Sequence, residues 1–194
     1  GADLTEFGSA PSQAIARQVR WERDLWGLFL SLKKPLVAAL HGYVLGSGVE
    51  MALLCDLRIA SEDAVFGLPE TALGMIPAAG GTQTLPRTIG VAGALDLLLT
   101  GRRLSARAAY ELGLVTRVVP RPQLLGEARL ALERILEADS EALACAKRAV
   151  LEGLDLPMRQ GLALEERLAV GLLMKKKKRI GRRPSHGSGD YSRA

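Results

Sequence analysis

The order of two hydrophobic patterns constrains the fold of this chain more than any other feature. From residue 36 to residue 119, short apolar runs typical of buried strands alternate with stretches that have the spacing of helices. From residue 122 onward the pattern is helical throughout. Alternation followed by helices alone predicts an α/β protein with a helical C-terminal extension.

Individual elements follow from the same patterns. A helix at 91–100 is predicted, and Ser105 is a good N-cap for another that ends at Leu112. Glycine-rich turns at 42–48 and 77–83 each lead into a helix. The other predicted strands are 36–41, 57–60, 64–67 and 115–119, and the other predicted helices are 11–32, 49–55, 124–138, 141–152 and 158–172.

The positive charge is concentrated at one end of the chain. The formal net charge is +5, yet the last twenty residues hold eight of the 26 basic side chains and a single acidic one, so residues 1–174 carry a net charge of −2. A fold-wide nucleic-acid surface is therefore not expected. The composition of residues 174–194 predicts a disordered basic tail.

Several classes of protein are excluded by what the sequence lacks. A hydrophobic fraction of 48% is too high for a disordered chain, and no apolar run reaches the roughly 20 residues of a membrane span. His41 is the single histidine before the tail, so a Ser-His-Asp triad is not expected. Cys55 and Cys145 lie far apart without metal-ligand spacing, so no metal site is predicted. The absence of a signal peptide favours the cytoplasm.

Two glutamates remain as candidates for chemistry. Glu50 follows the turn Gly46-Ser47-Gly48 in the first turn of a predicted helix, among apolar neighbours, and Glu70 comes just after another turn. Two carboxylates beside the free N–H groups of a helix start suit general acid and base work on a carbonyl compound. From the residues alone, Glu50 could equally complement the helix dipole and Glu70 could be a solvated loop carboxylate.

The segment Lys33 to Glu50, which reads KKPLVAALHGYVLGSGVE, resembles the central signature of the enoyl-CoA hydratase/isomerase (crotonase) family. The resemblance continues through residues 51–60, 66–70, 74–83, 99–106 and 109–115. It implies a crotonase-like ββα spiral core, N-terminally truncated relative to the family. The implied organisation is a partial spiral core at 1–120, a helical trimerisation region at 121–173 and the basic tail at 174–194.

The resemblance also implies roles for individual residues. In the family, two backbone N–H groups bind the thioester carbonyl oxygen. One follows the Gly of a Gly-Ala-Asp motif and the other lies three residues before the first catalytic glutamate, so the matching donors are Ala2 and Ser47. Asp3 and Leu4 complete this substrate-binding group. The two catalytic glutamates of the hydratases match Glu50 and Glu70.

The implied reaction is syn addition of water to a 2-enoyl-CoA thioester, giving a 3-hydroxyacyl-CoA. Glu50 acts chiefly as the base for attack at C3, and Glu70 chiefly supplies the proton to C2. Coenzyme A is part of the substrate, so no separate cofactor is expected. One alternative is an enoyl-CoA isomerase, which needs one base to carry a proton between C2 and C4. Another is a truncated, non-catalytic family member with a binding role, for example RNA binding through residues 175–183, although nucleic acid is the less favoured partner.

Further expectations come from the family pattern. Ser47 and Ala78 stand where the family usually has Gly, and a positive φ at Ser47 would cost about 1 kcal/mol. Family members are usually trimers or paired trimers, so a homotrimer or hexamer is expected. Mitochondrial localisation would replace the cytoplasm if a transit peptide preceded Gly1.

Overall fold

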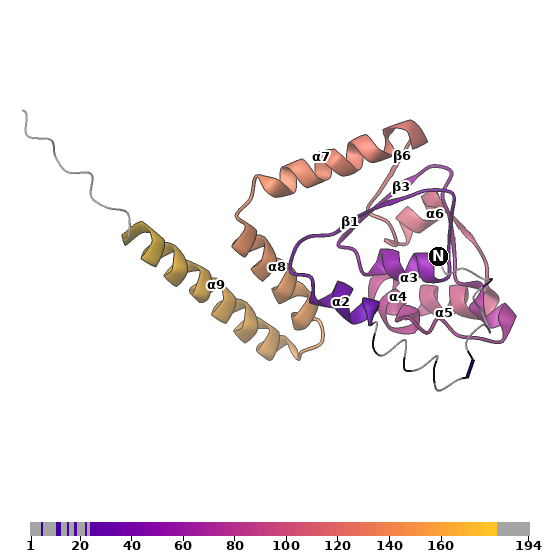
Figure 1. Ribbon diagram of the computed structural model, residues 1–194, viewed down its shortest axis with the longest axis horizontal. Coiled ribbons are helices and arrows are strands. Elements are labelled where there is room, and N and C mark those ends of the chain that lie inside the picture. The colour runs from indigo at the N-terminus through magenta and orange to yellow at the C-terminus, as the bar shows by residue number, and fades with distance from the viewer. Residues whose placement is uncertain are drawn as a thin grey trace, which may run out of the picture. The chain divides into compact units, whose positions relative to one another are not determined.

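The computed structural model describes residues 24–181, together with Thr5, Pro11, Ser12, Ile15, Gln18 and Glu22. The chain groups into two compact units that meet in sequence between Ala138 and Asp139. The first unit holds the strands of the described residues, and the second consists of helices α8 and α9 (Figure 1).

In the first unit, short strands alternate with short helices. Its elements in chain order are α2 (Leu25–Ser31), β1 (Val37–Leu40), β2 (Tyr43–Leu45), α3 (Ser47–Leu53), β3 (Leu57–Ser61), β4 (Val65–Gly67), the 3-10 helix η2 (Pro69–Leu73), α4 (Gly81–Ile89), α5 (Val91–Thr100), β5 (Leu104–Ser105), α6 (Ala106–Glu111), β6 (Arg117–Val119), the 3-10 helix η3 (Arg121–Gln123) and α7 (Leu124–Leu136). The second unit comprises α8 (Ser140–Gly153) and α9 (Met158–Gly181).

Two three-stranded sheets form the frame of the first unit. One has the order β1-β3-β6 with parallel pairing, and the other has the order β2-β4-β5, in which β4 pairs parallel with β2 and antiparallel with β5. The chain steps from the first sheet to the second between β1 and β2, and again between β3 and β4. This repeat of two strands followed by helices is the spiral that the sequence predicted.

Alternating side chains of the first sheet supply two separate apolar layers. Ile59 on β3 packs with Leu124 and neighbouring small residues of α7. Ala60, the next residue on β3, belongs instead to the larger core, which includes Leu85 of α4 and Leu97 of α5. Because successive strand residues point to opposite faces, one strand contributes to both layers. The larger layer fixes α3 and α4, and these helices hold the candidate site.

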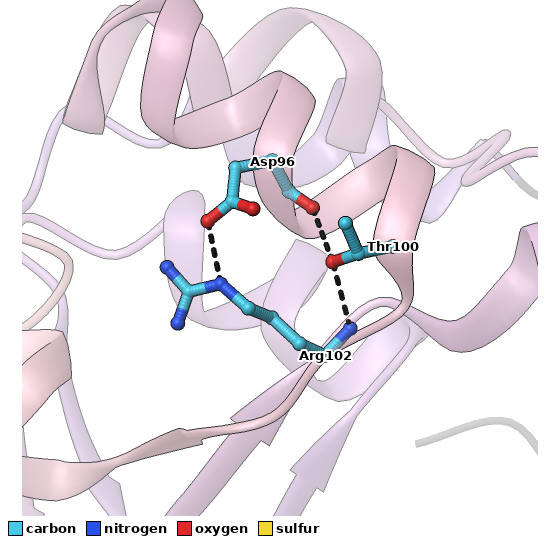
Figure 2. A network of polar contacts seen from close by, with 3 residues as sticks. All are labelled: Asp96, Thr100 and Arg102. Atoms are coloured by element: carbon cyan, nitrogen blue, oxygen red, sulfur yellow. Dashed lines mark hydrogen bonds and ion pairs between the residues drawn. The ribbon is translucent and has the colours of Figure 1, made fainter.

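A small polar network closes the end of α5. Figure 2 shows Arg102 folded back onto Asp96, with Nε donating to the carboxylate at 2.5 Å. The Thr100 hydroxyl donates to the Asp96 carbonyl at 2.5 Å and accepts from the Arg102 N–H at 3.2 Å. Gly101 between them has φ +63, a conformation that glycine adopts without strain. The network therefore sets where the chain leaves α5 and enters β5.

Three segment boundaries predicted from the sequence differ from the structure. The single helix predicted over 11–32 is wrong, because Asp24 is a non-helical N-cap that accepts from the Gly27 N–H at 2.9 Å and starts α2. The disordered tail is wrong for residues 174–181, which continue α9. Lysine and arginine are good helix formers and are favoured near a helix C-terminus, so the basic run extends the helix.

The third difference concerns the boundary between the two units. The sequence predicted it after residue 120, whereas the first unit extends to Ala138 and includes α7. The physical reason is that α7 packs on β1 and β3 and buries Ile59 beneath it. Hydrophobic periodicity marks α7 as a helix but does not show which sheet face it covers.

Two searches of the described residues gave no candidates. None of their helices is long and apolar enough to cross a membrane. Within the same part of the chain, no group of three or more His, Cys, Asp or Glu side chains is placed to hold a metal ion.

Candidate active site

Glu50 is placed by the tight turn between β2 and α3. Gly46 occupies this turn with φ +53 and ψ −124, and its N–H donates to the Gly67 carbonyl of β4 at 2.9 Å. The Glu50 N–H in turn donates to the Gly46 carbonyl at 3.1 Å, within the first turn of α3. The Glu50 side chain points inward and is only 2% exposed. A carboxylate buried this deeply requires hydrogen-bond donors.

Those donors come from the glycine-rich turn that precedes α4. Oε1 of Glu50 accepts from the N–H of Ala79 and from the N–H of Gly81, each at 2.9 Å. The first N–H groups of a helix have no partner within the helix. The Glu50 carboxylate therefore caps α4 from a different element, and it joins the start of α3 to the start of α4.

Glu70 reaches the same region from η2. Burial raises the pKa of the Glu70 carboxyl above its usual range; a backbone hydrogen bond opposes this shift, and the nearby charge of Glu50 adds to it. Oε2 of Glu70 is buried and has no hydrogen-bond partner among the described residues. An unpaired buried carboxyl oxygen is costly, so it is typical of a group that pairs with a substrate or water in function.

Two glycines give the glutamates their space. A Cβ on Gly46 would lie 2.8 Å from Oε1 of Glu70, and a Cβ on Gly81 would lie 2.9 Å from Oε1 of Glu50. The sequence predicts a glycine-rich turn at 77–83, but it does not predict that Gly81 lies against Glu50. The signal that could have revealed this relation is Gly81 itself, a glycine at the start of a helix where the backbone does not require a positive φ.

Ser47 is the first residue of α3 and lies partly buried. Ser47 is helical and Gly46 has the positive φ instead, so Ser47 avoids the conformation that would strain it. Its substitution for Gly therefore costs none of the strain anticipated. Ala78 lies exposed in the turn before α4. The other predicted substrate-binding residues, Ala2, Asp3 and Leu4, lie outside the described residues.

A cavity of about 330 Å³ opens in the first unit between α2, β1, β2 and α3. Neither Glu50 nor Glu70 is among the residues that line it, and Gly48 is the lining residue closest in sequence to the predicted donor Ser47. The lining is mostly apolar, with His41, Tyr43 and Cys55 as its polar side chains.

The fold is that of a known family. The family model for enoyl-CoA hydratase/isomerase matches residues 1–184. This chain therefore belongs to the enoyl-CoA hydratase/isomerase family, and the predicted crotonase-like α/β fold is confirmed by its similarity to solved structures.

Relatives in several organisms carry hydratase names. A protein of Dictyostelium discoideum named "Probable enoyl-CoA hydratase, mitochondrial" is 41% identical over 171 residues, which cover 87% of this chain and 60% of that protein. A "Probable enoyl-CoA hydratase" of Rhizobium meliloti is 47% identical over 143 residues, 74% of this chain and 56% of that protein. The chain thus spans somewhat more than half the length of these curated relatives.

Solved structures of other family members share this fold. The crystal structure of an enoyl-CoA hydratase from Bacillus anthracis superposes with a TM-score of 0.86 at 40% identity, covering 93% of this chain and 70% of that one. An enoyl-CoA hydratase subunit from Geobacillus kaustophilus gives 0.85 at 38% identity with the same coverage.

Proposed function

We propose that this chain carries the catalytic centre of an enoyl-CoA hydratase, which adds water across the double bond of a 2-enoyl-CoA thioester. The observation that carries the proposal is the convergence of a buried carboxylate, Glu50, and a partly buried one, Glu70, with unlike surroundings. Glu50 is held by two N–H groups, whereas Glu70 has an unpaired oxygen and a raised pKa. Family membership and the names of the relatives support the same activity.

Because their surroundings differ, the two glutamates have different roles in the proposed reaction. Glu50 takes a proton from water as the water oxygen bonds to C3 of the substrate. The raised pKa of Glu70 favours its protonated form, which suits delivery of a proton to C2. Electron density moves from the C2–C3 double bond toward the thioester oxygen, and the Ser47 N–H, at the start of α3, is a donor for that charge together with Ala2. The product gains one water, and coenzyme A stays attached throughout.

The test is the loss of enoyl-thioester absorbance with crotonyl-CoA. We expect activity in the parent chain and a loss of at least about 100-fold in Glu50→Gln and in Glu70→Gln, the usual scale of general acid–base catalysis. Glu62→Gln, at an exposed position of the same unit, is the matched control and should keep parent activity.

Inactivity of a folded parent, or glutamine variants as active as the control, would contradict the proposal. The isomerase alternative is tested in the same cuvette with a 3-enoyl-CoA. A rise in enoyl-thioester absorbance there, without hydration of crotonyl-CoA, would assign isomerisation instead.

We propose that the second unit mediates self-association, as expected for a homotrimer or hexamer. Val150 of α8 and the C-cap residue Leu154, four residues apart, are exposed, and so are Val170 and Leu173 on α9. Side chains spaced by three or four residues share a helix face, and exposed apolar faces of this kind mark interfaces.

A further inference from the structure

Gly81 is the first residue of α4, and its backbone places no demand for glycine. Its φ lies outside the left-handed range, in contrast to the preceding Gly80 with φ +101. Alanine is a better helix former than glycine, so helix propensity also favours a larger residue. The reason for a glycine at position 81 must therefore lie in what surrounds its Cα.

The surroundings are two side chains at very short range. A Cβ on Gly81 would lie 2.9 Å from Oε1 and 3.1 Å from Cγ of Glu50, and 2.7 Å from Cβ of Pro77. A Cβ on Gly80 would meet nothing closer than a Thr84 methyl at 3.9 Å. Gly80 is thus needed for the backbone of the turn, whereas Gly81 leaves the volume that the Glu50 carboxylate occupies.

The same residue also holds the carboxylate by hydrogen bonding. The N–H groups of Gly81 and Ala79 both reach Oε1 at 2.9 Å, and the structure gives Oε2 no hydrogen bond among the described residues. One oxygen is anchored and the other is left to accept a proton. The orientation of the carboxylate is fixed by this contact with the start of α4.

We propose that Gly81 is a positioning residue for Glu50: its missing side chain and its N–H together orient the carboxylate so that Oε2 is the oxygen that takes the proton from water. This inference rests on the proposed hydration, but the placement of the carboxylate can be tested without turnover.

The first experiment follows the backbone amides by ¹H–¹⁵N NMR during a pH titration. An N–H bonded to a carboxylate changes its chemical shift as that carboxylate titrates. We expect the Ala79 and Gly81 amides of the parent to follow one titration, and Glu50→Gln to remove it. In Gly81→Ala the titration shift of the Ala79 amide should shrink, because the new methyl displaces Oε1. Unchanged Ala79 and Gly81 titrations in Glu50→Gln would overturn the proposal, and this result needs no folded Gly81 variant.

The second experiment measures hydration kinetics in Gly81→Ala. A misplacement of about 1 Å costs about 100-fold, so we expect kcat to fall on that scale. KM should stay within about threefold, because substrate binding is not the target of the change. Gly126→Ala in α7 adds the same methyl group where nothing lies within 4 Å, and it should match the parent.

A double-mutant cycle separates Glu50 from Pro77 as the cause. Glu50→Asp withdraws the carboxylate by one methylene group, so Gly81→Ala should cost far less in that background than in the parent. An equal fold-loss in both backgrounds, or no loss in the parent, would overturn the proposal. An inactive parent with the expected amide titrations would refute the proposed function and leave the placement of Glu50 by Gly81 standing.

Discussion

The two units of this chain bury their apolar side chains to very different extents. The first unit has a continuous core in which Leu85, Ala60 and Ala109 are fully buried. In the second unit, Leu164 at 6% exposure is the single buried side chain among those described, and α8 has none. The two candidate catalytic glutamates, Glu50 and Glu70, belong to the densely packed unit. The sparsely buried unit exposes apolar side chains on both of its helices, which is the basis of the self-association proposed above.

The largest expected effect is on the stability of the first unit. Leu85→Ala removes a fully buried side chain and should lower the free energy of unfolding by about 3 kcal/mol. Leu162→Ala in α9, at a position 57% exposed, should change it by less than about 0.5 kcal/mol. Urea denaturation of both variants measures the contrast. Equal losses would show that the second unit has a core of its own.

Association should depend on the second unit. Replacing Leu154 and Leu173 by Asp places charge on the exposed apolar faces, and each change should raise the dissociation constant at least about tenfold, or 1.4 kcal/mol. Sedimentation over a range of concentrations gives the mass of parent and variants. Asp substitutions at Leu136, exposed on α7, serve as the control. A parent that is monomeric throughout would contradict the self-association proposal.

A smaller effect on stability is expected from Glu70 as the pH changes. Its pKa is raised above the ordinary 4.5 by burial, so between these two values the folded chain binds more protons than the unfolded chain. The stability contributed by Glu70 is therefore present below pH 4.5 and is lost as the pH rises through the raised pKa.

Glu70→Gln removes this dependence. We expect the variant to gain free energy of unfolding relative to the parent between about pH 4 and pH 8, as the linkage relation requires. Denaturation at both pH values, with Glu62→Gln as the reference, gives the measurement. A difference between variant and parent that does not change with pH would disprove the assignment.

The smallest effect belongs to the surface of the second unit. Lys175 pairs with Glu141 at 3.4 Å, and the two side chains are 66% and 48% exposed. Such pairs contribute little, so Lys175→Ala should change stability by less than about 0.5 kcal/mol, and added salt should erase the change. A larger loss would mean that this ion pair holds α8 and α9 together in the way that buried residues hold the first unit.

Local rules predicted most elements of this chain. Ser105 caps α6, accepting from the Ala108 N–H at 3.2 Å, and α5 spans the predicted residues 91–100. The strand β2 was missed, because three residues between glycines look like a turn until β4 pairs with them. The amphipathic pattern over 11–32 hides the N-cap Asp24, which lies inside it.

The candidate site, like the fold, could be predicted from the sequence only in part. Glu50 and Glu70 were singled out from the sequence, and the structure brings them within electrostatic reach of each other. The sequence pattern could not show which groups contact each carboxylate. The hydrogen bonds from residues 79 and 81 to residue 50 depend on how α3 and α4 pack, which is a tertiary relation. The fit of Gly46 against Glu70 has the same origin.

Because Glu50 caps α4, the two carboxylates have opposite effects on the stability of the fold. Glu50 ties two helices together, so the fold itself benefits from keeping it. Glu70 has an unpaired buried oxygen, which lowers the stability of the fold. In a descendant that is no longer selected for catalysis, selection for stability alone would replace Glu70 first. Glu50 would be retained, although its catalytic role had been lost.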